Sequence, residues 1–335
     1  MQGNLGGVDT LNITGTNTGS ADLQALVGGF DKVVVSGDST YLTVGGGWGT
    51  NNGDDLQIDA SALATATTFK LDDGGIILVN NLDIIGGHGN NDINLATSSG
   101  NQTVDLTASD TIVAFVGSYE NQVYLGTGVN NLTGGNNNNS IESRGSASTI
   151  TLGDGNNDIN LWLGTGIGGY DTVNLGNGSN TVLGSRNHHI TVNAGNGANT
   201  ISGGDLVDNI IVGGGGNLLN GGWEADSFTV TSAGSADGFV YNSIIDSQLG
   251  SGDSITGFTH AEDVINLSAL SMTNFTVTSG IYAMETYGTG AGTDASAYFA
   301  TDTHMLYIDS DGSGAADMEI ELVGVATIDL GDFIP

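Results

Sequence analysis

The sequence contains no cysteine and only one proline, Pro335, which is its last residue. Disulfide bonds are therefore excluded, and the redox compartment cannot be inferred from thiols. Because proline cannot donate to a ladder of backbone hydrogen bonds, its near absence suits long uninterrupted β-sheets. No run of about 18 apolar residues is present, so we expect no transmembrane helix. The first residues lack the basic and apolar regions of a Sec signal peptide, so none is expected.

Basic side chains are also nearly absent. Lys32, Lys70, Arg144 and Arg186 are the only ones, against 37 acidic residues, and the net charge is −33. A folded chain with this balance repels itself unless another source of positive charge is present, and divalent cations are the obvious candidates. Nucleic acid is excluded as a partner because phosphate binding needs lysine and arginine. Anionic membrane surfaces are not expected for the same reason.

Motifs of catalysis are missing too. The sequence has neither the H-E-x-x-H pattern of zinc proteases nor the G-x-S-x-G pattern of lipases. His188 and His189 are adjacent, so on a strand they point to opposite faces and form a poor zinc clamp. A polysaccharide lyase would need a basic catalytic residue, and only Arg144 and Arg186 are available in the repeat region. We therefore expect no enzymatic activity.

Glycine, in contrast, accounts for 57 of the 335 residues, and apolar residues recur among the glycine-rich turns at a fixed spacing. A polar residue followed by an aliphatic one returns every nine residues at Gln122-Val123, Asn131-Leu132, Ser140-Ile141, Thr149-Ile150 and Asp158-Ile159. After an insertion, the series resumes from 171 to 218 in steps of nine or ten residues. Nine residues are too few for a pair of helices but fit a short strand with a tight turn, so two units complete one coil of about 18 residues.

This pattern predicts an all-β protein, a parallel β-solenoid of stacked coils with a C-terminal β-rich cap. Glycine supplies the positive φ angles of the turns, and asparagine can stack in hydrogen-bonded ladders from coil to coil. We expect an irregular solenoid segment over residues 1–80, a repeat region over 81–230, and a cap with a secretion region over 231–335.

Three turns, at residues 86–93, 153–159 and 221–228, resemble the glycine-rich nonapeptide G-G-x-G-x-D-x-U-x of the RTX family. The resemblance implies that turn carbonyls and the motif aspartate bind Ca²⁺ between neighbouring coils, which agrees with the oxygen ligands that Ca²⁺ prefers. Several other turns carry asparagine in place of the aspartate, so we expect weaker binding or none there. The alternative is that these aspartates only cap turns through their own hydrogen bonds.

The expected calcium ligands in the repeat region are Gly87, Gly89, Asp92, Gly153, Asp154, Gly155, Asp158, Asp171, Asp205, Asp208, Gly222 and Asp226. A further set, Asp309, Asp311 and Asp317, lies in the stretch DSDGSGAAD. This stretch is not an EF-hand, because Ile320 stands where the bidentate glutamate is needed. It predicts a hairpin whose carboxylates hold Ca²⁺, with a plain glycine-rich turn as the alternative.

The stretches at 253–270 and 304–325 and the terminal DLGDFIP resemble the C-terminal region of RTX proteins exported by type I systems. This resemblance implies an extracellular location and an uncleaved C-terminal segment that the type I secretion machinery reads. The first 80 residues consist of strand-like runs, for example IDASALATATTF, joined by Gly/Asn/Ser turns, and in this respect they resemble bacterial surface-layer proteins.

We therefore expect a secreted calcium-binding structural protein that assembles with copies of itself as a surface layer, filament or matrix fibre. Cell-surface polysaccharide is a second candidate partner. The alternatives are a calcium-dependent adhesin or glycan-binding module and, less favoured, a polysaccharide lyase. Trp48, Trp162 and Trp223 could stack on sugars, although filling turns or capping the coil end is the favoured role.

Overall fold

The computed structural model describes residues 10–15, 20–22, 31–37, 41–43, 56–63, 69–72, 78–87, 91–95, 99–106, 111–115, 121–162, 166–281 and 294–335. The chain divides into two compact units. The N-terminal unit comprises Met1–Ile167 and Thr172–Gly176, and the C-terminal unit comprises Gly168–Asp171 and Asn177–Pro335. The predicted boundaries near residues 80 and 230 stay predictions. No helix in the described ranges is long and apolar enough to cross a membrane.

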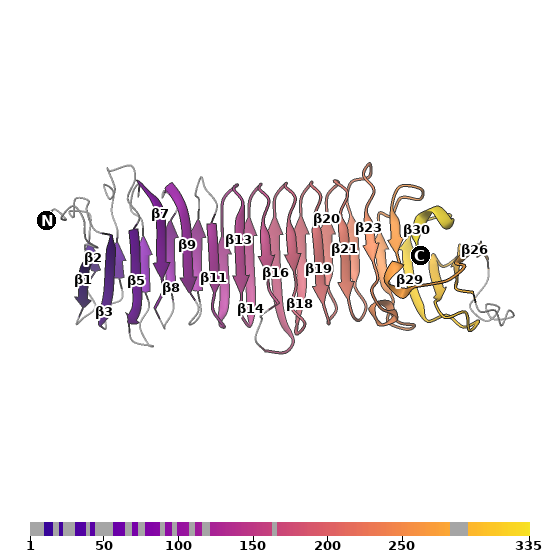
Figure 1. Cartoon of the computed structure of the whole chain (residues 1–335), viewed down its shortest axis with the longest axis horizontal. Helices are drawn as coiled ribbons and strands as arrows, with labels where there is room; N and C mark the ends of the chain where they lie inside the picture. Colours follow the sequence, from indigo (N-terminus) through magenta and orange to yellow (C-terminus); the bar gives the residue numbers. More distant parts are fainter. Residues whose placement is uncertain are drawn as a thin grey trace. The chain divides into compact units, whose positions relative to one another are not determined.

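The N-terminal unit consists of two parallel sheets, and successive strands alternate between them (Figure 1). One sheet contains β1 (Thr10–Gly15), β3 (Lys32–Gly37), β5 (Leu56–Leu63), β7 (Leu78–Ile85), β9 (Ser99–Leu106), β11 (Asn121–Leu125), β13 (Asn139–Ser143) and β15 (Asp158–Asn160). The other contains β2 (Ser20–Asp22), β4 (Tyr41–Thr43), β6 (Phe69–Asp72), β8 (Asn91–Leu95), β10 (Thr111–Phe115), β12 (Val129–Thr133), β14 (Ala147–Leu152) and the larger part of β16 (Gly169–Leu175).

The C-terminal unit repeats this plan and adds a cap (Figure 1). One sheet runs through β17 (Thr181–Leu183), β19 (Thr200–Gly204), β21 (Leu218–Gly222), β23 (Gly238–Val240), β25 (Val264–Asn266) and β30 (Phe333–Ile334). The other runs through β18 (His188–Ala194), β20 (Asn209–Val212), β22 (Ser227–Val230), β24 (Asp253–Thr256), β29 (Met318–Val323), β28 (Met305–Asp309), β27 (Ser296–Ala300) and β26 (Thr276–Gly280). Short 3-10 turns are η1 (Ile244–Ser247), η2 (Ser268–Leu270) and η4 (Leu330–Asp332).

The register of the strands confirms the predicted coil. Asn121 pairs with Asn139 in the N-terminal unit, and Asn209 pairs with Ser227 in the C-terminal unit, so equivalent positions are 18 residues apart. The parallel β-solenoid is therefore confirmed. The predicted cap is confirmed as well, because β27, β28 and β29 pair antiparallel at the end of one sheet.

The core is a thin apolar layer between the two sheets of each unit. Along β18, burial alternates residue by residue, so that the side chains of Ile190 and Val192 point inward while their neighbours face outward. Burial of one or two aliphatic side chains per strand is the main apolar contribution of each coil. In the C-terminal unit the core also contains aromatic residues. The rings of Phe228 and Phe239 pack edge to face, with 5.6 Å between their centroids.

Glycine is required at the turns where coils stack most closely. Gly197 and Gly215 have φ angles of 135° and 137°, which residues with a side chain rarely adopt. A Cβ on Gly197 would also overlap the carbonyl group of Gly178 in the neighbouring coil. The turns therefore need glycine both for their backbone conformation and for the close approach of the next coil.

The predicted asparagine ladder is present and lies inside the molecule. In the C-terminal unit the Nδ2 atom of Asn180 donates to Oδ1 of Asn199 at 2.9 Å, and Asn199 donates in the same way to Asn217 at 2.8 Å. In the N-terminal unit, equivalent bonds of 2.7 and 2.8 Å join three buried side chains, Asn121, Asn139 and Asn157. We call these two rows the amide ladders. An amide can both donate and accept, so the amides within each row satisfy one another, and the Oδ1 atom of Asn121 at the start of the N-terminal row has no hydrogen-bond partner among the described residues.

Replacing Asn199 with alanine should destabilise the folded chain by about 2–4 kcal/mol, because the amide partners on both sides lose buried hydrogen bonds. Urea unfolding at saturating calcium measures this loss. As a control, Asn187→Ala removes an exposed asparagine from the same unit and should cost less than about 0.5 kcal/mol. Equal losses for the two variants would contradict the structural role of the ladder.

Candidate metal centre

Three aspartates form a buried column along one sheet of the C-terminal unit. Asp208, Asp226 and Asp253 each stand at the start of a strand, at β20, β22 and β24, and occupy equivalent positions in successive coils. All three are at most 2 % exposed. We call these residues the carboxylate column.

One oxygen of each carboxylate is used by the backbone of the preceding coil. Oδ1 of Asp208 accepts a hydrogen bond from the amide of Ile190 at 2.7 Å. Oδ1 of Asp226 and Oδ1 of Asp253 accept from the amides of Asp208 and Asp226, both at 2.8 Å. The second oxygen, Oδ2, is buried in all three and makes no well-aligned hydrogen bond among the described residues, although the Gly204 amide lies near the carboxyl of Asp208 and the Tyr241 hydroxyl near that of Asp253. The column therefore carries a row of carboxyl oxygens whose hydrogen bonding is incomplete.

Glycines at the ends of β19 and β21 lie directly against two of these oxygens. A Cβ on Gly203 would overlap Oδ2 of Asp208 and the carbonyl oxygen of Gly221, and a Cβ on Gly221 would overlap Oδ2 of Asp226. The absence of side chains at both glycines thus keeps carboxylate and carbonyl oxygens close together. This donor set contains oxygen alone, which is what Ca²⁺ prefers. The column, with the carbonyls of the adjacent turns, therefore fits Ca²⁺.

The raised pKa values of the column carboxyls also indicate that they need a nearby cation to ionise. Burial raises the pKa of Asp208 to about 8 and that of Asp253 to about 8. Burial, together with the charges of Asp253 and Asp208, raises the pKa of Asp226 to about 9. Tyr241, fully buried nearby, has its pKa raised well above 10 by burial and by the charge of Asp253. When bound, Ca²⁺ supplies the positive charge that lets these carboxyls ionise at neutral pH.

The column of incompletely hydrogen-bonded oxygens begins at Asp208, because Asp171 already has a partner. Oδ2 of Asp171 lies 2.8 Å from Nδ1 of His188, and both side chains are buried. His189 points to the other face, where its ring stacks on Tyr170 with centroids 4.8 Å apart. The prediction that the adjacent histidines point to opposite faces is therefore confirmed.

On the other sheet of the C-terminal unit, the same inward position is satisfied without a cation. There the amide ladder ends on Asp237, whose Oδ1 accepts from Nδ2 of Asn217 at 2.7 Å. Oδ1 of Asp263 accepts from the Asp237 amide at 2.8 Å, and its Oδ2 accepts from the Thr259 amide at 2.7 Å. Asparagine in the motif position thus forms hydrogen bonds between coils.

The predicted ligands are distributed unevenly. Asp208 and Asp226 belong to the column, whereas Asp154 and Asp158 are exposed and Asp205 is half-buried. In the turn at 153–159 the inward residue is Asn157, directly before Asp158. Gly153 and Gly155 lie in that turn, and Gly222, with a φ of 107°, lies in the turn before Asp226. The role of these residues in calcium binding stays a prediction.

The turn at 86–93 is described only in part. Gly89 and the side chain of Asp92 lie outside the described residues. Asn91 is buried, and its Oδ1 accepts a hydrogen bond from the amide of Gly87 at 2.8 Å. As in the turn at 153–159, an asparagine directly before the aspartate takes the inward position.

The stretch DSDGSGAAD forms the predicted hairpin between β28 and β29. Its carboxylates gather, because one oxygen each of Asp309, Asp311 and Asp317 lies within 4.8 Å of the others. However, the two oxygens of Asp309 accept from the amides of Ser313 and Gly314 at 3.1 and 2.7 Å. These bonds hold the loop, and a metal-binding role for the three aspartates stays a prediction.

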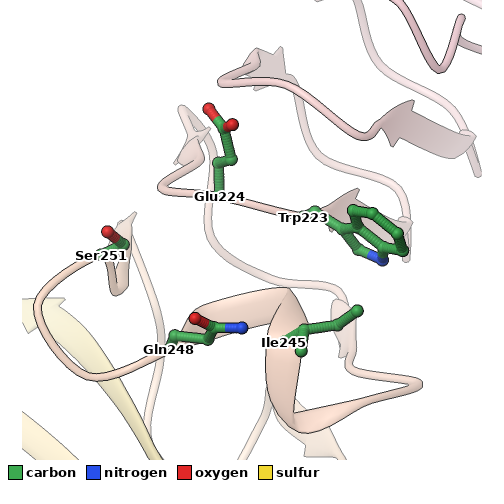
Figure 2. Close-up of a pocket in the computed structure, with 5 residues that line it drawn as sticks. All are labelled: Trp223, Glu224, Ile245, Gln248 and Ser251. Atoms are coloured by element: carbon green, nitrogen blue, oxygen red, sulfur yellow. The ribbon is translucent and has the colours of Figure 1, made fainter.

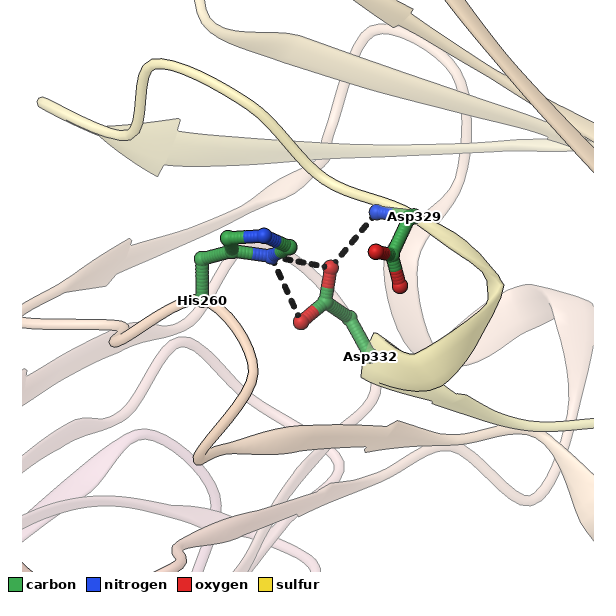
Figure 3. Close-up of side chains that lie close together, drawn as sticks. All are labelled: His260, Asp329 and Asp332. Carbon is green, nitrogen blue, oxygen red and sulfur yellow. Dashed lines mark hydrogen bonds and ion pairs between the residues drawn. The ribbon is translucent and has the colours of Figure 1, made fainter.

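Sequence reasoning missed two groups. Asp253 lies 27 residues after Asp226 instead of 18, so the nine-residue series does not reach it. The other group is His260 with Asp329 and Asp332 (Figure 3). The buried carboxylate of Asp332 lies 2.9 Å from Nδ1 of His260 and accepts from the Asp329 amide at 2.7 Å. It thereby fastens η4 to the turn before β25, and nothing in the local sequence marks a contact across 72 residues.

A family model described as Peptidase M10 serralysin C terminal matches residues 82–334. The matched span contains the carboxylate column, the amide ladders and the antiparallel cap. The model describes the RTX-type repeat region of these peptidases, which binds calcium, and not their catalytic domain. No curated protein matches the chain.

Replacing Asp226 with asparagine should raise the calcium concentration at the midpoint of folding at least about tenfold, because the column loses its central charge. Asparagine fits the backbone here, as the amide ladders show, so the variant should still fold. Circular dichroism during calcium titration measures the midpoint. Asp302→Asn, the same change at an exposed aspartate that is not an expected calcium ligand, should leave the midpoint unchanged, and a loss as large as that of Asp226→Asn would contradict the assignment.

Without calcium, the folded chain should lose stability as the pH rises from about 5.5 to 8.5. The column carboxyls have folded pKa values of about 8 to 9, above the ordinary value of 3.8. The folded state therefore holds protons that the unfolded state has released, and this stabilisation disappears as the pH passes the folded pKa values. Ordinary carboxyls are already ionised above about pH 5.5, so they do not contribute in this window.

Thermal unfolding in calcium-free buffer at pH 5.5, 7 and 8.5 measures this dependence. The midpoint temperature should fall along the series, and saturating calcium should remove the fall. Asp226→Asn should show a shallower slope than the native chain. A midpoint in calcium-free buffer that stays constant or rises with pH would show that the column does not titrate as described.

Proposed function

The chain belongs to the family of Peptidase M10 serralysin C-terminal domains, whose RTX-type repeats form calcium-binding β-rolls, and from this premise we propose that it is a secreted structural protein that folds on calcium and assembles outside the cell. The observation that carries the proposal is the carboxylate column, with three buried carboxylates that each keep an oxygen without a well-aligned hydrogen bond. Such a column is costly without a cation and stable with one.

Folding that depends on calcium is compatible with export of the unfolded chain from the cell. RTX-type proteins are typically secreted by type I systems, and the free calcium concentration is low in the cytosol and higher outside the cell. A chain with a net charge of −33 and a buried carboxylate column stays poorly folded where calcium is scarce. Folding then follows passage across the envelope, where the column and its glycine carbonyls bind the ion.

The edge of the cap supports assembly with further copies of the chain. Among the described strands, β26 pairs with β27 alone, and most of its side chains are exposed. Its five residues, TVTSG, contain no charge and no proline, which are the features that usually protect an edge strand. An unprotected edge can pair with a strand of a second copy. A surface layer, a filament or a matrix fibre would each be built from such contacts.

Electron microscopy of the purified chain, with about 5–10 mM calcium and with chelator, tests the proposal. Ordered sheets or fibres should form with calcium and disappear with chelator. Single particles in both conditions would contradict assembly.

The variant Ser279→Lys tests the edge itself, because lysine on an edge strand opposes pairing with another chain. It should reduce assembly while calcium-dependent folding remains. The matched control is Thr149→Lys, which places the same charge at an exposed position on β14, a strand paired on both sides. Equal assembly by the two variants would exclude β26 as the contact.

A further inference from the structure

A pocket of about 280 Å³ lies on the C-terminal unit between the turn that follows β21 and the segment that contains η1 (Figure 2). Trp223 and Glu224 line it from the turn, and Ile245, Gln248 and Ser251 line it from the other side. This volume is slightly below the range for ligand pockets, which begins at about 300 Å³. The pocket is therefore suited to one small ring.

Trp223 offers an aromatic surface to this pocket. Its side chain is 47 % exposed, so about half of the indole surface is not covered by the chain. Ile244 and Leu249, also exposed, lie on the segment around η1. A large half-exposed aromatic ring beside a hollow is a common feature of binding sites, because the ring gains contact area only when a ligand covers it.

The opposite wall supplies polar groups. The side chains of Gln248 and Ser251 make no hydrogen bond among the described residues, and both are exposed. A side-chain amide and a hydroxyl can each donate and accept. A purely apolar ligand would leave these groups unpaired, whereas a ligand rich in hydroxyl groups would satisfy them.

Both walls are held in place before any ligand binds. Glu224 has a φ of 70°, a left-handed conformation that is uncommon for a residue with a side chain and is often found at functional sites. On the other wall, Ser243 and Asp246 form a capping box that fixes η1. The amide of Gly250 also donates to Oε1 of Glu319 at 2.7 Å. Such preorganisation lowers the entropy that a ligand must lose on binding.

We propose that this pocket binds one neutral pyranose ring of a saccharide. The apolar face of the ring would stack on the indole of Trp223, and its hydroxyl groups would exchange hydrogen bonds with Gln248 and Ser251. The net charge of −33 and the carboxylate of Glu224 oppose uronates and other anionic sugars. The proposal is independent of self-assembly, since it requires only the folded C-terminal unit.

The experiment uses the full calcium-loaded chain and measures binding by saturation-transfer NMR and calorimetry. The probes are neutral trisaccharides, cellotriose and maltotriose, with trigalacturonate as the anionic comparison. At least one neutral probe should bind with a Kd of about 1 mM or tighter, and the anionic probe should bind at least about tenfold more weakly. No binding of either neutral probe at about 10 mM, or preferential binding of trigalacturonate, would overturn the proposal.

Variants assign the binding to the pocket. Trp223→Ala should weaken binding about tenfold or more, since the stacking surface is lost. Gln248→Ala should weaken it about three- to tenfold through the lost hydrogen bonds. The matched control, Trp162→Ala, removes another half-exposed tryptophan and should bind like the native chain. Should Trp223→Ala not fold, Trp223→Phe keeps a smaller ring and should retain partial affinity. Native affinity in the folded Trp223→Ala variant, or a loss in the control equal to that of Gln248→Ala, would overturn the proposal.

Discussion

The structure depends on one constraint, the burial of a polar side chain at the start of each strand in the repeat. Stacked coils bring equivalent residues into a row, so the same kind of polar group recurs from coil to coil and needs a partner in each. The chain meets this constraint in two ways. Asn180, Asn199 and Asn217 form an amide ladder that satisfies itself. Asp208, Asp226 and Asp253 form a column that does not, because each places one oxygen on the backbone of the preceding coil and leaves the other without a well-aligned hydrogen bond.

This difference determines where we expect calcium to act. Each column carboxylate uses one oxygen on the backbone of the preceding coil, and the other oxygen of Asp208 and of Asp226 lies against a glycine at the end of β19 or β21. The oxygens come together only when coils stack, so we expect calcium binding here to be coupled to folding. The amide ladders need no ion, so the parts of the roll that they connect depend on packing and hydrogen bonds alone. The buried pair of Asp171 and His188 ends the column, because its carboxylate is already matched.

The coil length, the strand positions and the glycine turns can be predicted from the sequence, because all three follow from a period of nine residues. The sequence does not show which polar residue points into the core where two candidates are adjacent. Asn157 and Asp158 both fit the motif, and only the alternation of the strand decides that Asn157 points inward. Asp253 was missed since an insertion lengthens its coil, and the contact of His260 with Asp332 joins residues 72 positions apart. Such contacts depend on the stacked structure and leave no local pattern.

The turn from Gly221 to Asp226 connects the two sites of the C-terminal unit. Its inner end places the Asp226 carboxylate in the column, and two residues before that end Glu224 adopts a left-handed conformation beside the exposed indole of Trp223. The turn is also tied to the preceding coil, because the Trp223 amide donates to the carbonyl of Gly204 at 3.0 Å. We therefore expect ion binding at the column to order the turn that carries the indole. By linkage, a saccharide that needs the ordered turn must in return favour the calcium-bound state.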